Sequence, residues 1–193
     1  SLERSQKIDT IVLDKTGTLT RGEPMVTDIV TNGVSENDIL LFAGSAEKGS
    51  EHPLGEAIVR GAIEKGLKIE APDEFEALAG HGVSAVVNGR KVLLGNERLM
   101  SEQKIDFGKL LSEAEKLSSL GKTPMFVALD DKPAGIIAVA DTLKEHSKEA
   151  VSMLKSLGLE VVMLTGDNRR TAQAIAEELG ISRVLAEVLP QDK

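Results

Sequence analysis

The apolar run Ile11–Leu13 ends at Asp14, and the next six residues, Lys15–Thr20, form a stretch rich in glycine and hydroxyl groups. A short run of aliphatic residues is typical of a buried strand in a parallel sheet, and the polar stretch indicates a turn at its carboxyl end. Open α/β sheets bind their ligands at this edge. The junction therefore predicts an α/β fold in which Asp14 is a candidate nucleophile toward a phosphoryl group. In a generic D-x-x-G sequence, however, the aspartate more often only stabilises a turn.

The pattern of elements predicts one domain inserted into another. The outer pieces alternate between strands and helices, which is typical of a parallel sheet, whereas the middle has period-two runs joined by tight turns. We expect strands at 8–14, 76–78, 83–87, 91–94, 125–129, 136–140, 161–164 and 184–186. Two helices are expected to begin near Ser35 and Pro53, and a third to span about 109–120. A fourth helix should follow Asp141 with Val151, Leu154 and Leu157 inward, and a fifth should follow Asn168 with Ala172, Ile175, Ala176 and Leu179 inward.

A second polar motif, Thr165–Asn168, follows the apolar residues Val162–Leu164. It is expected at the end of one strand and the start of a helix, where backbone N–H groups and the helix dipole favour a phosphate. Asp167 or Asn168 also suits the N-cap of that helix. Because parallel strands end at one edge, this motif and Asp14 are expected to share a site.

In this order, Asp14–Thr20 resembles the phosphorylation motif of the P-type ATPases, ion pumps whose catalytic core is similar to haloacid dehalogenase-type phosphotransferases. The resemblance implies a haloacid-dehalogenase-like parallel-sheet phosphorylation domain made of residues 1–22 and 141–193. It also implies an inserted α+β nucleotide-binding domain, residues 23–140, built on an antiparallel sheet.

The resemblance implies that Asp14 attacks the γ-phosphate of ATP, with Mg²⁺ held by the Asp14 carboxylate and the Thr16 main-chain carbonyl. Thr16 stands where hydrolytic relatives usually carry a second Asp as general acid and base, so the acyl phosphate should be long-lived. Residues implied at the phosphate site are Lys15, Thr16, Thr18, Thr165, Gly166, the supporting Asp167, and Lys193, which ends a segment resembling the one that carries the family's lysine.

Ser50–Gly55 resembles the SEHP motif of the heavy-metal-transporting branch, in which the histidine orients adenine. Pro53 suits the first turn of a helix, so Glu51 and His52 are expected in the loop before it. The further nucleotide contacts that the resemblance implies are Gly80, Gly82, Gly95 and Asn96, whereas His81 and His146 receive no role.

Composition excludes several classes of function. The net charge is −8, so the chain has no overall basic character to attract nucleic acid, and it has no Cys for disulfides or thiolate metal sites. We expect a monomeric fragment from the cytoplasmic portion of an integral plasma-membrane pump, with ATP and Mg²⁺ as cofactors. Its partners would be the pump's own transmembrane and actuator domains. The family's GDGxND segment does not occur in the chain, so weak Mg²⁺ binding and little turnover are expected.

Copper is our expectation for the transported ion, which this fragment would not bind itself. Zinc, cadmium and cobalt remain open, because selectivity in the branch lies in membrane helices. Two other functions stay open at this point. A soluble phosphatase of the dehalogenase type would share Asp14 but should carry an acid in place of Thr16. A non-catalytic nucleotide-binding module would keep the middle domain without depending on Asp14.

Overall fold

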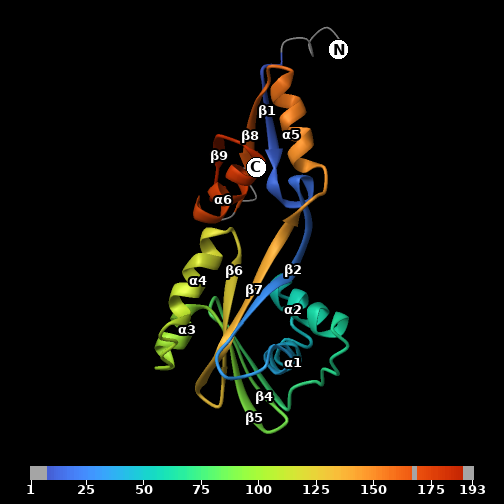
Figure 1. Cartoon of the computed structure of the whole chain (residues 1–193). Coiled ribbons are helices and arrows are strands. Elements are labelled where there is room, and N and C mark those ends of the chain that lie inside the picture. Colours follow the sequence, from blue (N-terminus) through green and yellow to red (C-terminus); the bar gives the residue numbers. More distant parts are fainter. Residues whose placement is uncertain (1–7, 167–168, 189–193) are drawn as a thin grey trace. The chain divides into compact units, whose positions relative to one another are not determined.

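The computed structural model describes residues 8–166 and 169–188 of the 193-residue chain. Asp167 and Lys193, both predicted site residues, lie outside the described residues. The chain divides into two compact units, whose elements are labelled in Figure 1. Unit 1 contains the chain up to Glu23, the short segment Ser119–Gly121 and the chain from Asp141 onward, whereas unit 2 contains Pro24–Ser118 and Lys122–Ala140.

Unit 1 is built on a three-stranded parallel sheet in the order β1–β8–β9. Two helices pack with this sheet around a single apolar core. Leu157, predicted to point inward, is 70% exposed, because it is the C-cap of its helix and no longer follows the buried stripe. The elements are β1 (Thr10–Asp14), β8 (Glu160–Leu164), β9 (Arg183–Leu185), α5 (Ser147–Ser156) and α6 (Arg169–Leu179).

A tight turn and a long strand follow β1. Lys15–Leu19 makes one π-helical turn, η2, interrupted by non-helical backbone at Thr16 and by Gly17 with φ of 77°. Glycine adopts this left-handed conformation without steric cost. The strand β2 (Thr20–Thr31) then begins. Sequence reasoning missed β2, because Gly22 and Pro24 interrupt the period-two pattern in its first half.

Unit 2 is built on a six-stranded sheet in the order β2–β7–β6–β5–β4–β3, and the pairings from β7 through β3 are antiparallel. The two predicted hairpin turns are present. Asn88 and Gly89 have φ of 52° and 73°, and Asp130 and Asp131 have φ of 51° and 59°, as primed hairpin turns require. The strands are β3 (Glu74–Leu78), β4 (Gly82–Val87), β5 (Arg90–Gly95), β6 (Thr123–Leu129) and β7 (Lys132–Leu143).

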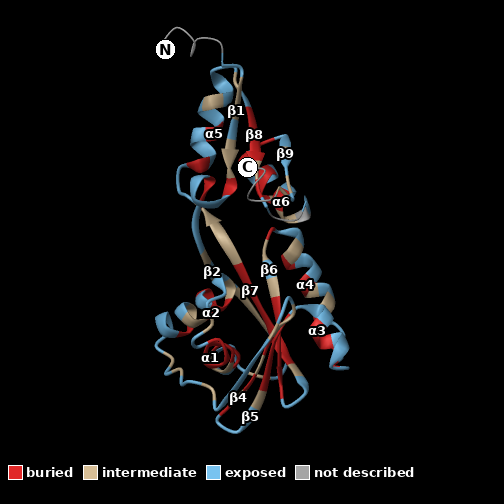
Figure 2. Cartoon of the chain, turned by 180° about the vertical axis from the view of Figure 1, so that it is seen from behind, coloured by how far each residue is buried: buried red, intermediate tan, exposed pale blue. Residues whose placement is uncertain are grey.

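Helices cover both faces of the unit 2 sheet (Figure 1). Two consecutive residues of β6 show this, because their side chains point to opposite faces of the sheet. Val127 belongs to the cluster with α1 (Glu36–Ala46) and α2 (Pro53–Glu64), whereas Phe126 belongs to the cluster with α3 (Glu97–Glu102) and α4 (Leu110–Ser119). The strand centres are consequently buried on both sides, as Figure 2 shows. The fold class predicted from the sequence, a parallel sheet combined with an inserted antiparallel α+β part, is confirmed.

Candidate catalytic and nucleotide-binding sites

The first candidate site lies at the carboxyl ends of β1 and β8. Asp14 pairs with Leu164 in the parallel ladder, so Asp14 and Thr165 lie at the same edge of the sheet. Thr165 is buried and its N–H donates to the carbonyl of Leu185, 2.9 Å away, while its own carbonyl accepts from the N–H of Val188. Asp14 is half-buried. Register alone thus brings the two polar motifs together.

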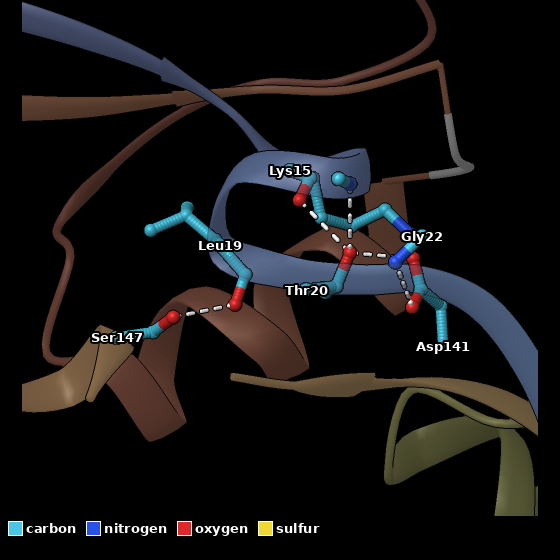
Figure 3. A network of polar contacts seen from close by, with 7 residues as sticks. Lys15, Leu19, Thr20, Gly22, Asp141 and Ser147 are labelled. Atoms are coloured by element: carbon cyan, nitrogen blue, oxygen red, sulfur yellow. Dashed lines mark hydrogen bonds and ion pairs between the residues drawn. The ribbon is translucent and has the colours of Figure 1, made fainter. Parts of the chain in front are cut away.

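The turn after Asp14 is held by a buried polar network (Figure 3). The hydroxyl of Thr20 lies 2.9 Å from the carbonyl oxygen of Lys15 and 2.5 Å from Oδ2 of Asp141, and it accepts from the N–H of Gly17. The other carboxylate oxygen of Asp141 accepts from the N–H of Gly22 at 2.9 Å. Lys15 is buried, with its Nζ 3.9 Å from the same Asp141 carboxylate. One carboxylate therefore organises both ends of the turn.

A second set of contacts joins the turn to the segment after Asp141, where the chain returns to unit 1. Nζ of Lys144 donates to the carbonyl of Gly17 at 2.5 Å, and the hydroxyl of Ser147 donates to the carbonyl of Leu19 at 2.6 Å. Figure 3 shows the Ser147 contact from α5. Thr16 and Thr18 stay exposed on the turn. The loop is thus held by its backbone, while its hydroxyl side chains remain accessible.

The donor chemistry at this edge suits a hard cation. Mg²⁺ takes oxygen ligands and is usually bound through one or two carboxylates together with substrate phosphates and water. The carboxylate of Asp14, a half-buried residue, and the carbonyl of Thr16 are donors of that kind. Among the described residues, no group of three or more His, Cys, Asp or Glu could hold a metal ion by itself. The residues present therefore fit a metal that substrate oxygens help to bind.

The second candidate site is a cleft of about 420 Å³ in unit 2. Five of the six predicted nucleotide-binding residues line it, and Glu51, which is exposed, does not. Apolar side chains supply much of the remaining surface, as expected of a cleft that takes a flat organic ring. The lining residues used below are His52, Gly80, Gly82, Gly95, Asn96, Glu47, Ser50, Leu54, Phe75, His81 and Met125.

Pro53 is the first residue of α2, as predicted, and His52, which was expected in the loop before the helix, is its N-cap. Its Nδ1 accepts a hydrogen bond from the N–H of Leu54 at 3.2 Å. An imidazole nitrogen that accepts carries no proton, so the proton of neutral His52 is on Nε2. His52 therefore presents an N–H donor while its other nitrogen stabilises the helix.

The glycine turn between β3 and β4 forms another wall of the cleft. Gly82 has φ of 146°, and a Cβ atom there would overlap the carbonyl of Leu94. Asn96 fixes the turn, because its side-chain N–H donates to the carbonyl of Gly80 at 3.0 Å and its backbone N–H donates to the carbonyl of His81 at 2.9 Å. These hydrogen bonds hold the turn in place. Because Gly80 and Gly82 have no side chains, a ligand can approach the backbone of the turn closely.

Glu47 lines the same cleft and was missed by sequence reasoning. It is only 3% exposed, and its Oε2 atom has no hydrogen-bond partner among the described residues. Burial raises the pKa of this carboxyl, although a hydrogen bond from Ser50 and the nearby His52 oppose the shift. Glu47 is also the C-cap of α1, where the helix dipole disfavours a carboxylate, but its burial could not be predicted from residue spacing.

Comparisons with known proteins agree with this geometry. Residues 8–193 match the family model of the haloacid dehalogenase-like hydrolases. A copper-exporting P-type ATPase of Bacillus subtilis (strain 168) is 52% identical over 193 residues, which are 100% of this chain and 24% of that protein. The chain thus spans about a quarter of the length of the curated relatives it matches.

Solved structures give the same result. A zinc-transporting PIB-type ATPase in its E2.Pi state is 41% identical with a TM-score of 0.87, covering 99% of this chain and 31% of that one. The catalytic domain of the CPx-ATPase CopB-B, from a study of nucleotide binding, is 27% identical with a TM-score of 0.69, covering 98% and 65%. No helix in the described part of the chain has the length and hydropathy needed to cross a membrane. The chain belongs to the haloacid dehalogenase-like hydrolase family, and within that family it is a relative of the catalytic domains of the heavy-metal P-type ATPases.

Proposed function

We propose that this chain is the ATP-binding and autophosphorylating unit of a membrane pump for heavy-metal ions. The pairing of Asp14 with Leu164 is the observation that supports the proposal most, because it brings the two polar motifs to one edge of a parallel sheet. Unit 1 would be the phosphorylation domain and unit 2 the nucleotide-binding domain.

In the proposed reaction, a carboxylate oxygen of Asp14 attacks the γ-phosphorus of ATP. A new P–O bond forms to Asp14, the bond between the γ-phosphorus and the β,γ-bridging oxygen breaks, and ADP leaves with that oxygen. Thr165 and Gly166 would contact the transferred group, and the ammonium of Lys15 would offset its charge. Asp167 and Lys193 keep the supporting and phosphate-binding roles that the family resemblance implies for them.

Asp141 would act as a positioning residue for this step. Its carboxylate binds Thr20 and Gly22 and lies beside Lys15, so the turn keeps its shape before substrate arrives. A preorganised loop does not have to reorganise during phosphoryl transfer. Mg²⁺ held by Asp14 and Thr16 would neutralise charge on the phosphates when it is bound.

ATP would occupy the unit 2 cleft. The adenine ring suits the apolar surface around Leu54, Phe75 and Met125, and Nε2–H of His52 can donate to a ring nitrogen. The unpaired oxygen of Glu47 can accept from the amino group of adenine, which would explain why Oε2 has no partner among the described residues although the carboxylate is buried. Gly80, Gly82, Gly95 and Asn96 would complete the site, and Glu51 would act from the adjoining loop.

Copper is the proposed cargo, because the curated relatives described above are copper exporters, although the solved PIB-type neighbour is named for zinc. The transmembrane and actuator domains of the same pump would be the partners of this chain. Its place would then be the cytoplasmic side of the plasma membrane.

Substituting the proposed nucleophile tests the mechanism. In the full-length pump, ATP radiolabelled at the γ-phosphate should give an acid-stable label that hydroxylamine removes, as an acyl phosphate requires. Asp14→Asn should lower the label to background, because an amide cannot form the acyl phosphate. Asp9→Asn, which changes an exposed aspartate just before β1, is the matched control and should keep the label. Labelling of the Asp14→Asn pump equal to wild type would exclude Asp14 as the acceptor.

A further inference from the structure

The unit 2 cleft has an unusual charge composition for a nucleotide site. Its lining residues, all in the described part of the chain, include no Lys or Arg, and their ionisable side chains are Glu47, His52 and His81. ATP carries several negative charges on its phosphates. Because the cleft wall supplies no fixed positive charge, an imidazole is the group on it that could become cationic near neutral pH.

The two histidines are not equivalent in this respect. Nδ1 of His52 accepts from the N–H of Leu54, so protonating that nitrogen would break the N-cap of α2. His81 has the opposite arrangement, because its Nδ1 lies 2.7 Å from the carbonyl oxygen of Ala79. A carbonyl only accepts, so Nδ1 of His81 already carries its proton and a second proton can be added at Nε2 without losing a contact.

The position of His81 is fixed. Asn96 binds its carbonyl, and Gly95 packs so closely against that carbonyl that a Cβ atom at Gly95 would overlap it. The ring is held by the Ala79 contact and is 27% exposed on the cleft wall. His81 therefore lines the cleft with its backbone and ring both constrained, so it would lose little conformational entropy when a ligand binds.

The charged groups around His81 come mainly from α3. Nε2 lies 3.9 Å from the Glu102 carboxylate, and the same carboxylate oxygen accepts from Nε of Arg98 at 2.9 Å. Glu97 begins that helix and is exposed, while Glu47 and His52 face the cleft from α1 and the start of α2. The Glu102 carboxylate beside His81 is thus already paired with Arg98. A bound phosphate chain would bring a second negative group to the imidazole.

We propose that His81 holds the phosphate chain of the bound nucleotide through Nε2–H and takes up one proton on binding. This inference rests on the proposed nucleotide cleft of unit 2 and assigns a role to a residue that motif resemblance left without one. The ligand class is a purine nucleotide with at least two phosphates, and the bare nucleoside should not engage His81.

Titration calorimetry of the 193-residue chain tests the proposal, using ATP and adenosine with a chelator present so that no metal masks the phosphate charge. Between about pH 8 and pH 6, ATP affinity of wild type should rise about 3- to 10-fold more than that of His81→Gln. Runs in buffers of different ionisation enthalpy should show uptake of close to one proton with ATP and none with adenosine.

Two variants control the measurement. His146→Gln, which changes an exposed histidine at the start of α5, should behave as wild type. His81→Lys should bind ATP well at both pH values, because its charge is fixed. Unchanged adenosine affinity in His81→Gln would show that the cleft is intact in that variant.

The outcomes separate this inference from the proposed function. If wild type binds neither ATP nor adenosine, the nucleotide cleft is wrong and the role of His81 fails with it. If wild type binds ATP but His81→Gln has the same affinity and the same pH dependence, only the role of His81 is overturned.

Discussion

At the scale of single residues, the cleft contains a carboxyl group that lowers the stability of the fold. Glu47 is buried with an unpaired oxygen, and Gly55 lies so close to it that a Cβ at Gly55 would overlap the carboxylate. Buried polar atoms without partners cost about 1–3 kcal/mol. A group that destabilises the protein in this way is typical of a site whose missing partner is a ligand.

Glu47→Gln should therefore stabilise the chain and weaken its purine binding. Because burial raises the pKa of Glu47 in the folded state, ionising it at neutral pH opposes folding, and this cost disappears below the unfolded pKa of about 4.3. We expect the free energy of unfolding in urea to rise by about 1 kcal/mol at neutral pH, and the gain to vanish as the pH approaches 4.

Adenosine affinity of the same variant should fall several-fold, since an amide oxygen accepts more weakly than a carboxylate. Glu70→Gln is the matched control, because Glu70 is an exposed glutamate of unit 2 that does not line the cleft and has no proposed role in binding. A Glu47→Gln protein less stable than wild type at neutral pH would contradict this account.

Sequence reasoning at this scale succeeded where a local signal existed. Pro53 marked the first turn of α2 and therefore placed His52 just before that helix, where the structure has it as the N-cap. Glu47 was missed because its importance depends on burial by α2, which residue spacing does not show. The carboxylate of Asp141 was missed as a partner of Thr20 for a related reason, since the two residues are 121 positions apart.

At the scale of elements, hydrophobic periodicity predicted most of the strands and helices that are long enough to show a repeat. β4 and β5 alternate about the Asn88-Gly89 turn, and both were expected within two residues of their observed bounds. The short helix α3 was missed, because six residues are fewer than two turns and show no repeat. Its N-cap is Asn96, which resemblance had assigned only to nucleotide contact.

The glycine turn of the cleft gives a prediction about stability. Gly82→Ala should lower the free energy of unfolding by about 2–4 kcal/mol, because φ of 146° is strained for alanine and the new Cβ would overlap the Leu94 carbonyl. Gly66→Ala is the matched control, since Gly66 has φ of 74° but no atom within 4 Å of an added Cβ. It should cost about 1 kcal/mol. Equal urea midpoints for the two variants would show that the close approach at Gly82 is unimportant.

At the scale of the whole molecule, each unit has its own apolar core. Unit 1 is packed around Val151, Met163 and Ala176, whereas the sheet of unit 2 has a cluster on each face. The alternation of strands and helices in the outer segments predicted that they share a parallel sheet, and β1 does pair with β8. The contacts that hold the Lys15–Leu19 turn could not be predicted, because they join segments with no shared local pattern.

Separate cores predict a local response to a ligand. Adenosine has no phosphates, so its binding should slow amide hydrogen exchange in the α1–α2 loop and the β3–β4 turn of unit 2. Exchange in β1 and β8 should not change, because their core is formed by unit 1 residues alone. Hydrogen-exchange mass spectrometry with and without adenosine measures both regions at once. Protection of equal size in β8 would contradict the prediction.

The pairing of β1 with β8 also has a consequence for how the chain is made. The ribosome synthesises Thr10 and its ladder partner Glu160 with 150 positions between them, so β1 leaves the exit tunnel long before its neighbour exists. In the sequence, all residues of unit 2 come after β1 and before β8, so unit 2 can form its sheet first. The strand that carries the proposed nucleophile therefore has no ladder partner during most of translation. The acceptor site is assembled only after β8 has emerged from the ribosome.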